Sequence, residues 1–185
     1  MTLYRCFAWD ERAYAAAPGG ALWFPRPLQG EGRHDGPGRY GCLYVSEAPV
    51  SAVVEQLAPL TGTVLGAGDL RRSGLPLAVA VLSLAGAAKL VDLDEPLVLA
   101  AAGLRPSLVA TEERALTQGA AAALYDRHEG AAGLRWWSGF EAQWANVTLF
   151  DRALTALSVE AIRPLELDDA VVGEAARYLG LRRAA

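Results

Sequence analysis

The chain has 185 residues, of which 52% are hydrophobic and 21% are charged, so it is long enough and apolar enough to bury a substantial core as one domain. Its net charge of −4 excludes a general nucleic-acid binder, which would carry a basic stripe. No segment resembles a membrane span, and the first residues lack the apolar run of a secretory signal. We therefore expect a cytoplasmic protein that binds neither nucleic acid nor membranes.

The N-terminal part predicts one strand followed by a long loop. Residues 3–9 alternate well enough to form a strand, and Arg5 lies inside it. The commoner interpretation is an arginine that faces water at a sheet edge, and the alternative is a cleft arginine held by a rigid strand. Residues 18–41 are rich in glycine and proline, which predicts either a binding loop or a mobile surface connection. His34 has no histidine or cysteine partner at metal-ligand spacing, so we expect it to be solvated.

The next segment predicts a strand and a helix. Residues 42–45 form a short apolar strand, Ser46 is positioned to cap the helix, and Pro49 fits its first turn. The buried face of this helix has apolar residues at helical spacing: Val50, Val53, Val54 and Leu57. Glu55 falls on the opposite face, where a solvated glutamate is the usual interpretation. The residues beside it are small, and a face of small residues suits the lining of a cleft: Ser51, Ala52 and Ala58.

The remaining pattern predicts further strands at residues 77–84, 89–93, 133–138, 146–150 and 155–162. Helices are expected from Asp94 to Gly103, over residues 107–129, and over residues 165–181 with Asp168 or Asp169 as the cap. Strands and helices do not alternate regularly. We therefore predict an α+β fold, in which residues 1–185 form a single domain with a mixed or antiparallel sheet core flanked by helices. Two cysteines, Cys6 and Cys42, are expected to be buried free thiols, with a disulfide as the alternative.

Several common catalytic motifs are absent. There is no Walker loop, no dinucleotide-binding glycine pattern between a strand and a helix, and no Gly-x-Ser-x-Gly elbow. Cysteine and histidine spacing offers no zinc site. Only one of the 17 basic residues is a lysine, Lys89, so any phosphate contact falls to arginine, whose planar fork suits phosphate.

Four short motifs in this order resemble the RES domain family, which is named for an arginine, a glutamate and a serine. They are Tyr4-Arg5, Gly38-Arg39-Tyr40 before Leu43-Tyr44-Val45-Ser46, Ala52-Val53-Val54-Glu55, and Gly133-Leu134-Arg135-Trp136-Trp137-Ser138. The resemblance runs from about residue 3 to residue 151. It departs from the family where Tyr40-Gly41 replaces an aromatic–Asn pair and where Trp136-Trp137 replaces a Val-Pro pair. It implies an ADP-ribosyltransferase-like fold, and several members are toxins of bacterial toxin–antitoxin pairs that consume NAD⁺.

The resemblance also implies roles for particular residues, with NAD⁺ as substrate and with no prosthetic group or metal. Glu55 would stabilise the positive charge that develops on the ribose when the nicotinamide bond breaks. Arg5 and Arg39 would bind the pyrophosphate, and Tyr44 would stack on the nicotinamide or donate a hydrogen bond to it. Ser138 would orient the nicotinamide amide or the ribose. Thr117 or another hydroxyl is the alternative for that last role.

Three functions remain open on the sequence. The first is an NAD⁺ glycohydrolase or phosphorylase, and the second is an enzyme that transfers ADP-ribose to a protein. The third is a catalytically silent binding module of the same fold. A cognate antitoxin is a possible partner in the first case. The apolar stripe of the C-terminal helix packs either on the core or on another copy of the chain.

Overall fold

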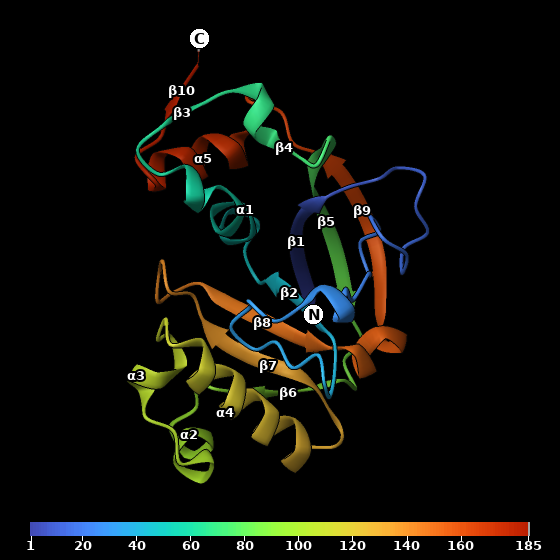
Figure 1. Cartoon of the computed structure of the whole chain (residues 1–185), viewed down its shortest axis with the longest axis vertical. Helices are drawn as coiled ribbons and strands as arrows, with labels where there is room; N and C mark the ends of the chain where they lie inside the picture. The colour runs from blue at the N-terminus through green and yellow to red at the C-terminus, as the bar shows by residue number, and fades with distance from the viewer. Residues whose placement is uncertain (185) are drawn as a thin grey trace. The chain divides into compact units, whose positions relative to one another are not determined.

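A computed structural model describes residues 1–184, and its strands and helices are labelled in Figure 1. The strands are β1 (Thr2–Ala8), β2 (Cys42–Ser46), β3 (Val64–Leu65), β4 (Arg71–Arg72), β5 (Leu75–Leu84), β6 (Lys89–Asp92), β7 (Ala131–Trp137), β8 (Ala145–Phe150), β9 (Leu157–Pro164) and β10 (Arg182–Arg183). The α-helices are α1 (Pro49–Leu57), α2 (Pro96–Ala102), α3 (Pro106–Val109), α4 (Arg114–Arg127) and α5 (Ala170–Tyr178). Parallel and antiparallel pairs both occur, so the predicted α+β fold with a mixed sheet is confirmed.

The described residues divide into two compact units. The first unit contains Met1, Phe24–Val45 and Leu84–Leu157. The second unit contains Thr2–Trp23, Ser46–Ser83 and the chain from Ser158 onward. Each unit has strands and helices of its own.

The first unit is built on four strands in the order β2-β8-β7-β6. β7 pairs antiparallel with β8 and parallel with β6, and α4 packs against β7 (Figure 1). Apolar residues from these strands and from α2, α3 and α4 form one continuous core: Tyr40, Cys42, Val91, Leu93, Leu99, Val109, Ala121, Leu124, Ala131, Leu134, Trp136 and Phe150. This core supports the loop that leads into β2.

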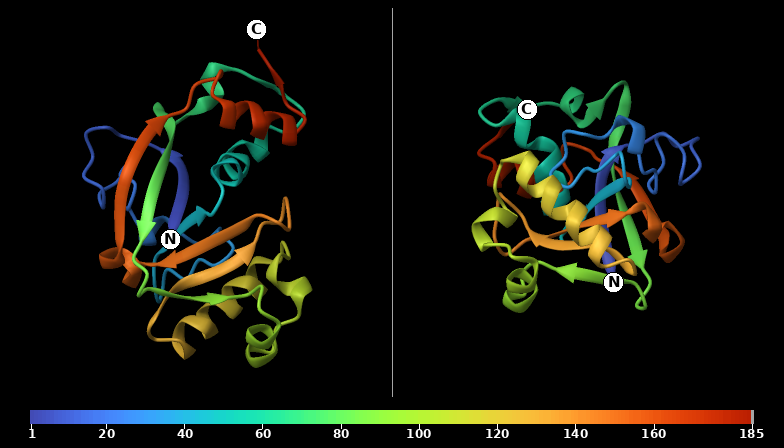
Figure 2. Two further views of the ribbon diagram at one scale, coloured as in Figure 1. Left: turned by 180° about the vertical axis from the view of Figure 1, so that it is seen from behind. Right: turned by 60° about the horizontal axis from the view of Figure 1, so that its bottom comes forward.

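The second unit is built on β5, which pairs antiparallel with β1 and β4 and also pairs with β9 (Figure 2). Arg5 of β1 lies opposite Ala80 of β5. α1 packs against both β1 and α5, so two sides of this short helix are covered. That packing buries Ser51 and Ala52 together with the predicted apolar face. Small residues are therefore required there for close packing, and the interpretation of these two residues as a cleft lining is wrong.

Most predicted elements are confirmed, and the N-cap residue differs from the prediction in two helices. α1 begins at Pro49 as predicted, but its N-cap is Ala48, and Ser46 lies at the end of β2. α2 has Glu95 as its N-cap, whereas Asp94 was expected. Gly103 does end α2, in the left-handed conformation with φ of 68°, which glycine adopts at little cost.

The helix predicted over residues 107–129 is broken in two. α3 ends at Val109 and α4 begins at Arg114. The Arg33 guanidinium donates hydrogen bonds to the carbonyl oxygens of Val109 and Thr111, which a continuous helix would use for its own ladder. A distant arginine therefore satisfies the backbone at the break, and the Thr111 hydroxyl accepts the backbone N–H of Glu113 in a local turn at the same place.

Gly133 is the position where we expect a single methyl group to damage the first unit. An ideal Cβ at Gly133 would lie 2.2 Å from the carbonyl oxygen of Thr148 on β8. The two strands would have to separate at this buried point. We expect Gly133→Ala to lower the free energy of unfolding by about 2 kcal/mol or more, the usual cost of overpacking.

Chemical denaturation measures this effect, and Gly86→Ala is the matched control. A Cβ at Gly86 meets no atom within 4 Å, so its substitution should change stability by no more than about 0.5 kcal/mol. Equal denaturation midpoints for the two variants would contradict the predicted close approach of β7 and β8.

Candidate functional site

The loop before β2 is tied to Tyr44 by a closed set of hydrogen bonds within the first unit. The Tyr44 hydroxyl donates to Oδ1 of Asp35 over 2.7 Å and accepts from the backbone N–H of His34 over 2.9 Å. Oδ2 of Asp35 accepts from the backbone N–H groups of Gly30 and Gly32 over 2.8 and 2.7 Å. A Cβ at Gly32 would lie 2.5 Å from the Tyr44 hydroxyl, so only glycine fits there. Residues 30–35 therefore form a rigid turn, in a segment that the sequence predicts only as an irregular loop.

Helix α4 holds the same turn from its other side. The amide of Gln118 donates to the carbonyl oxygens of Gly30 and Gly32, each over 2.8 Å. The Thr117 hydroxyl donates to the carbonyl oxygen of Arg33 over 2.6 Å and is itself buried. The carbonyl oxygen of Arg114 on the same helix lies farther from this hydroxyl, at 3.2 Å, so the shorter bond to Arg33 anchors the backbone of the turn.

Arg33 is the cation that this turn presents. Its guanidinium lies over the ring of Trp136, with Cζ 5.0 Å from the ring centroid, and donates to the carbonyl oxygens of Val109 and Thr111. Its Nη2 lies 3.8 Å from the point where a Cβ of Gly139 would be, which brings the guanidinium close to the turn after β7. The Trp136 ring and the two carbonyl oxygens hold the guanidinium in place, and the Arg33 side chain as a whole is half-buried.

Ser138 begins that turn. It is 3% exposed, its hydroxyl accepts from the backbone N–H of Phe140 over 3.1 Å, and its own N–H donates to the carbonyl oxygen of Trp144. The strand predicted over residues 133–138 corresponds to β7, which ends at Trp137, one residue before the serine. Ser138 and Arg33 thus lie in the same part of the first unit.

His34 is buried, with 3% of its surface exposed, so the expectation that it is solvated is wrong. Its Nδ1 lies 2.8 Å from the Thr148 hydroxyl oxygen, and its ring meets that of Trp136 edge-on. The Trp136 indole donates to the same hydroxyl oxygen, which favours the tautomer in which the Thr148 hydroxyl donates to Nδ1 and Nε2 carries the ring proton. Burial, helped by Arg33 and Arg114, lowers the pKa of His34 to about 3.

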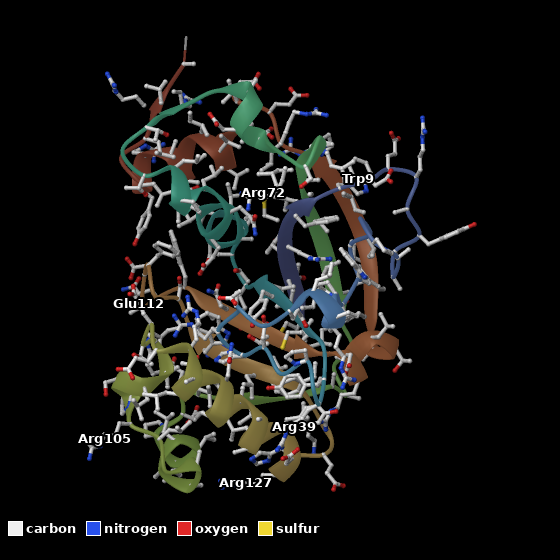
Figure 3. The ribbon with its side chains drawn as sticks, viewed as in Figure 1. Trp9, Arg39, Arg72, Arg105, Glu112 and Arg127 are labelled. Carbon is white, nitrogen blue, oxygen red and sulfur yellow. The ribbon has the colours of Figure 1, made fainter. Side chains whose placement is uncertain are left out.

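Arg39 lies at the surface of the first unit, beside α4 (Figure 3). Its guanidinium forms an ion pair with Asp126, and about half of each side chain is exposed. Arg39 follows Gly38, and Arg33 follows Gly32, so the sequence contains two Gly-Arg segments before β2. The turn held by Tyr44 contains the first of them, and the resemblance in sequence used the second.

Arg5 is in the second unit. Its Nη1 donates to the carbonyl oxygens of Gly20 and Ala21 over 3.0 and 2.7 Å, and its Cζ lies 4.7 Å from the centroid of the Phe7 ring. Burial lowers its pKa to about 10, so it stays a cation at neutral pH. Within residues 1–184, its Nε and Nη2 have no protein acceptor. Those two donors form an edge that suits a phosphate oxygen pair.

Glu55 is also in the second unit, on α1. It is exposed, while the preceding turn of the helix at Ser51 and Ala52 is packed inside the unit. The Glu55 side chain is therefore exposed to solvent, and the helix that carries it is packed against β1 and α5. Arg5 and Glu55 thus belong to the second unit, and Arg33, Tyr44 and Ser138 belong to the first.

Arg33 is a cation of this turn that the sequence analysis did not single out. The signal available was its place in Gly32-Arg33-His34-Asp35, eleven residues before Tyr44, just as Glu55 follows Tyr44 by eleven residues. In the structure the two residues that follow Arg33 bond to the Tyr44 hydroxyl: the backbone N–H of His34 donates to it, and Oδ1 of Asp35 accepts from it.

Fold and side chains together define an α+β protein with a mixed sheet, a buried aspartate–tyrosine turn that presents an arginine, and an exposed helix glutamate. Comparison with known proteins then identifies the family. The chain belongs to the RES domain family, whose model matches residues 2–169. A search of curated proteins found no match.

Among solved structures, the chain is similar to the crystal structure of the M. tuberculosis MbcT-MbcA toxin-antitoxin complex. The TM-score is 0.62 at 15% sequence identity, and the match covers 98% of this chain and 88% of the other. At that identity the likeness establishes the fold. In the described residues, no helix is long and apolar enough to cross a membrane. Both cysteines are buried free thiols, as predicted.

Proposed function

We propose that this protein degrades NAD⁺ by cleaving the bond between nicotinamide and ribose. The observation that carries the proposal is membership of the RES domain family over residues 2–169. The arrangement within each unit supports it, since Arg5 and Arg33 are cations held by defined contacts and Glu55 is a reachable carboxylate. No step of the proposed reaction draws on a bound metal.

The chemistry of the proposed reaction follows from the charge of the substrate. When the C1–N bond breaks, its electron pair stays on the pyridinium nitrogen, so nicotinamide leaves as a neutral molecule and positive charge moves to the ribose. The carboxylate of Glu55 stabilises that charge. Water or phosphate then bonds to C1, and water loses its extra proton to solvent. Arg5 and Arg33 bind the pyrophosphate, and Ser138 orients the nicotinamide amide or the ribose.

Tyr44 receives a narrower role than the sequence suggested. Its single hydroxyl hydrogen is bonded to Asp35, and burial, followed by the Cys42 thiol and Asp35, raises its pKa, so the phenol stays neutral. In the proposed site Tyr44 therefore contributes its ring face by stacking, without donating a hydrogen bond to the substrate.

Incubating the purified protein with NAD⁺, with and without phosphate, tests the function. Release of nicotinamide with free ADP-ribose, or with its phosphate ester when phosphate is present, supports the proposal. Transfer of radiolabel from labelled NAD⁺ to a protein would support ADP-ribosyl transfer, the second candidate. The same arginine and glutamate positions favour that function as well. Binding without turnover would support a silent binding module.

A toxin–antitoxin role is the biological form of the same proposal. The similar structure of MbcT-MbcA contains a toxin together with its antitoxin. We propose that this chain is likewise a toxin with a cognate antitoxin that inhibits it. Induced expression should arrest bacterial growth, and co-expression of the protein encoded next to it should restore growth. Normal growth on induction of an active enzyme would contradict the toxin role while leaving NAD⁺ degradation intact.

Two alanine substitutions distinguish the contribution of Arg33 to NAD⁺ affinity from that of Arg39. We expect Arg33→Ala to raise the dissociation constant for NAD⁺ about tenfold or more, because it removes a charge-assisted contact to phosphate. Arg39→Ala should have the smaller effect, since its guanidinium is exposed and already pairs with Asp126. Isothermal titration calorimetry measures both. A larger loss at Arg39 than at Arg33 would restore the assignment made from sequence alone.

A further inference from the structure

Asp35 is a charged side chain that lies almost entirely inside the first unit. It is 6% exposed, and its two oxygens accept three hydrogen bonds, from the N–H groups of Gly30 and Gly32 and from the Tyr44 hydroxyl. Within residues 1–184 no arginine or lysine pairs with it. Burying the Asp35 carboxylate costs desolvation free energy, and the three hydrogen bonds from neutral donors offset that cost.

The contacts of Asp35 fix the backbone on both sides of Arg33. Asp35 holds the N–H of Gly32 directly, and it holds the N–H of His34 through Tyr44, whose oxygen accepts that group. The carbonyl oxygen of Arg33 is held by Thr117. The peptide unit between Glu31 and Gly32 and the one between Arg33 and His34 are therefore both oriented by one carboxylate, directly or through one phenol.

We propose that Asp35 is a positioning residue, which fixes the Gly30–Asp35 turn and so sets the direction in which Arg33 presents its guanidinium. The role in NAD⁺ binding rests on the proposed function of Arg33. The role in orienting Arg33 does not, because it is a property of the free protein.

Two substitutions at Asp35 separate this role from a general contribution to stability. In Asp35→Asn the amide oxygen can accept from Gly30 and Gly32, and the amide N–H can donate to the Tyr44 oxygen, so the turn is kept and the Tyr44 hydrogen is released. In Asp35→Ala all three donors lose their acceptor and the turn is freed. Asp151→Ala is the matched control, because Asp151 also accepts from a loop N–H, that of Gly41, without touching the Arg33 turn.

The first measurement is NAD⁺ affinity by calorimetry, at a temperature where all variants are folded. We expect Asp35→Ala to raise the dissociation constant about tenfold or more, as loss of the Arg33 contact itself would. Asp35→Asn and Asp151→Ala should stay within about threefold of the wild type. An Asp35→Ala variant that is folded and binds NAD⁺ like the wild type overturns the proposal. If the alanine variant does not fold, Asp35→Glu, whose longer chain displaces both oxygens, takes its place.

The second measurement needs no ligand. The Nε–H resonance of Arg33, assigned by its loss in Arg33→Lys, should be a single sharp signal in the wild type and in Asp35→Asn. In Asp35→Ala it should broaden and move toward the position of a solvent-exposed arginine. An unchanged signal in Asp35→Ala shows that Asp35 does not orient Arg33 and overturns the proposal. A wild-type protein that binds no NAD⁺ but shows the expected change refutes the proposed function alone.

Discussion

Glu55→Gln should lower the rate of NAD⁺ cleavage by about a hundredfold to a thousandfold, the usual loss when one electrostatic contact to a developing charge is removed. Glutamine has the size of glutamate and can still bind a ribose hydroxyl, but it has no negative charge to stabilise the positive ribose. Substrate affinity should change far less than the turnover number, because NAD⁺ in the ground state carries its positive charge on the nicotinamide ring.

The fold should be unaffected by this substitution, so a lower rate of NAD⁺ cleavage would not be explained by unfolding. Glu55 is exposed on α1, and the stability of that helix comes from the residues packed on β1 and α5. Glu174→Gln, at an exposed position of α5 in the same unit, is the matched control and should keep full activity. NAD⁺ consumption by Glu55→Gln at the wild-type rate would remove Glu55 from the reaction.

The longer sheet strands were predictable because their signals are local, whereas the two-residue strands β3, β4 and β10 were not predicted. The continuous apolar run at residues 77–84 lies within β5, and the run at residues 146–150 lies within β8. The contacts of Arg33 that stabilise the break between α3 and α4 were not predictable, because Arg33 lies more than seventy residues earlier in the chain. Contacts of that range leave no trace in a window of neighbouring residues.

The candidate site also has features that local sequence signals predict and features that depend on contacts distant along the chain. The periodicity of α1 places Glu55 on the exposed face of its helix, which the structure confirms. The sequence did not show which of the two Gly-Arg segments lies in the turn held by Tyr44, because the distance along the chain does not reveal these hydrogen bonds. Thr117 shows why the role of a hydroxyl group could not be predicted from the sequence. Its use as an anchor for the Arg33 carbonyl depends on how α4 packs, which no motif encodes.

His34 should make the protein sensitive to acid. Its pKa is lowered from the ordinary value of 6.5 to about 3, chiefly by burial, so the folded protein keeps the ring neutral across this range. Below about pH 6 the unfolded chain binds a proton at this residue and the folded chain does not. The unfolded state is therefore favoured as the pH falls, and the free energy of unfolding should drop by about 1.4 kcal/mol per pH unit until about pH 3.

The contribution of His34 is isolated by comparison with His34→Asn. The asparagine oxygen can accept the Thr148 hydroxyl hydrogen in place of Nδ1, but it does not titrate. This variant should be less stable at neutral pH, because the smaller side chain leaves space beside Trp136, yet its stability should fall less steeply between pH 6 and pH 4. Urea denaturation at a series of pH values gives both slopes, and carboxylates contribute equally to each. The same slope for both proteins would mean that His34 is protonated in the folded state, which its contacts with Thr148 and Trp136 argue against.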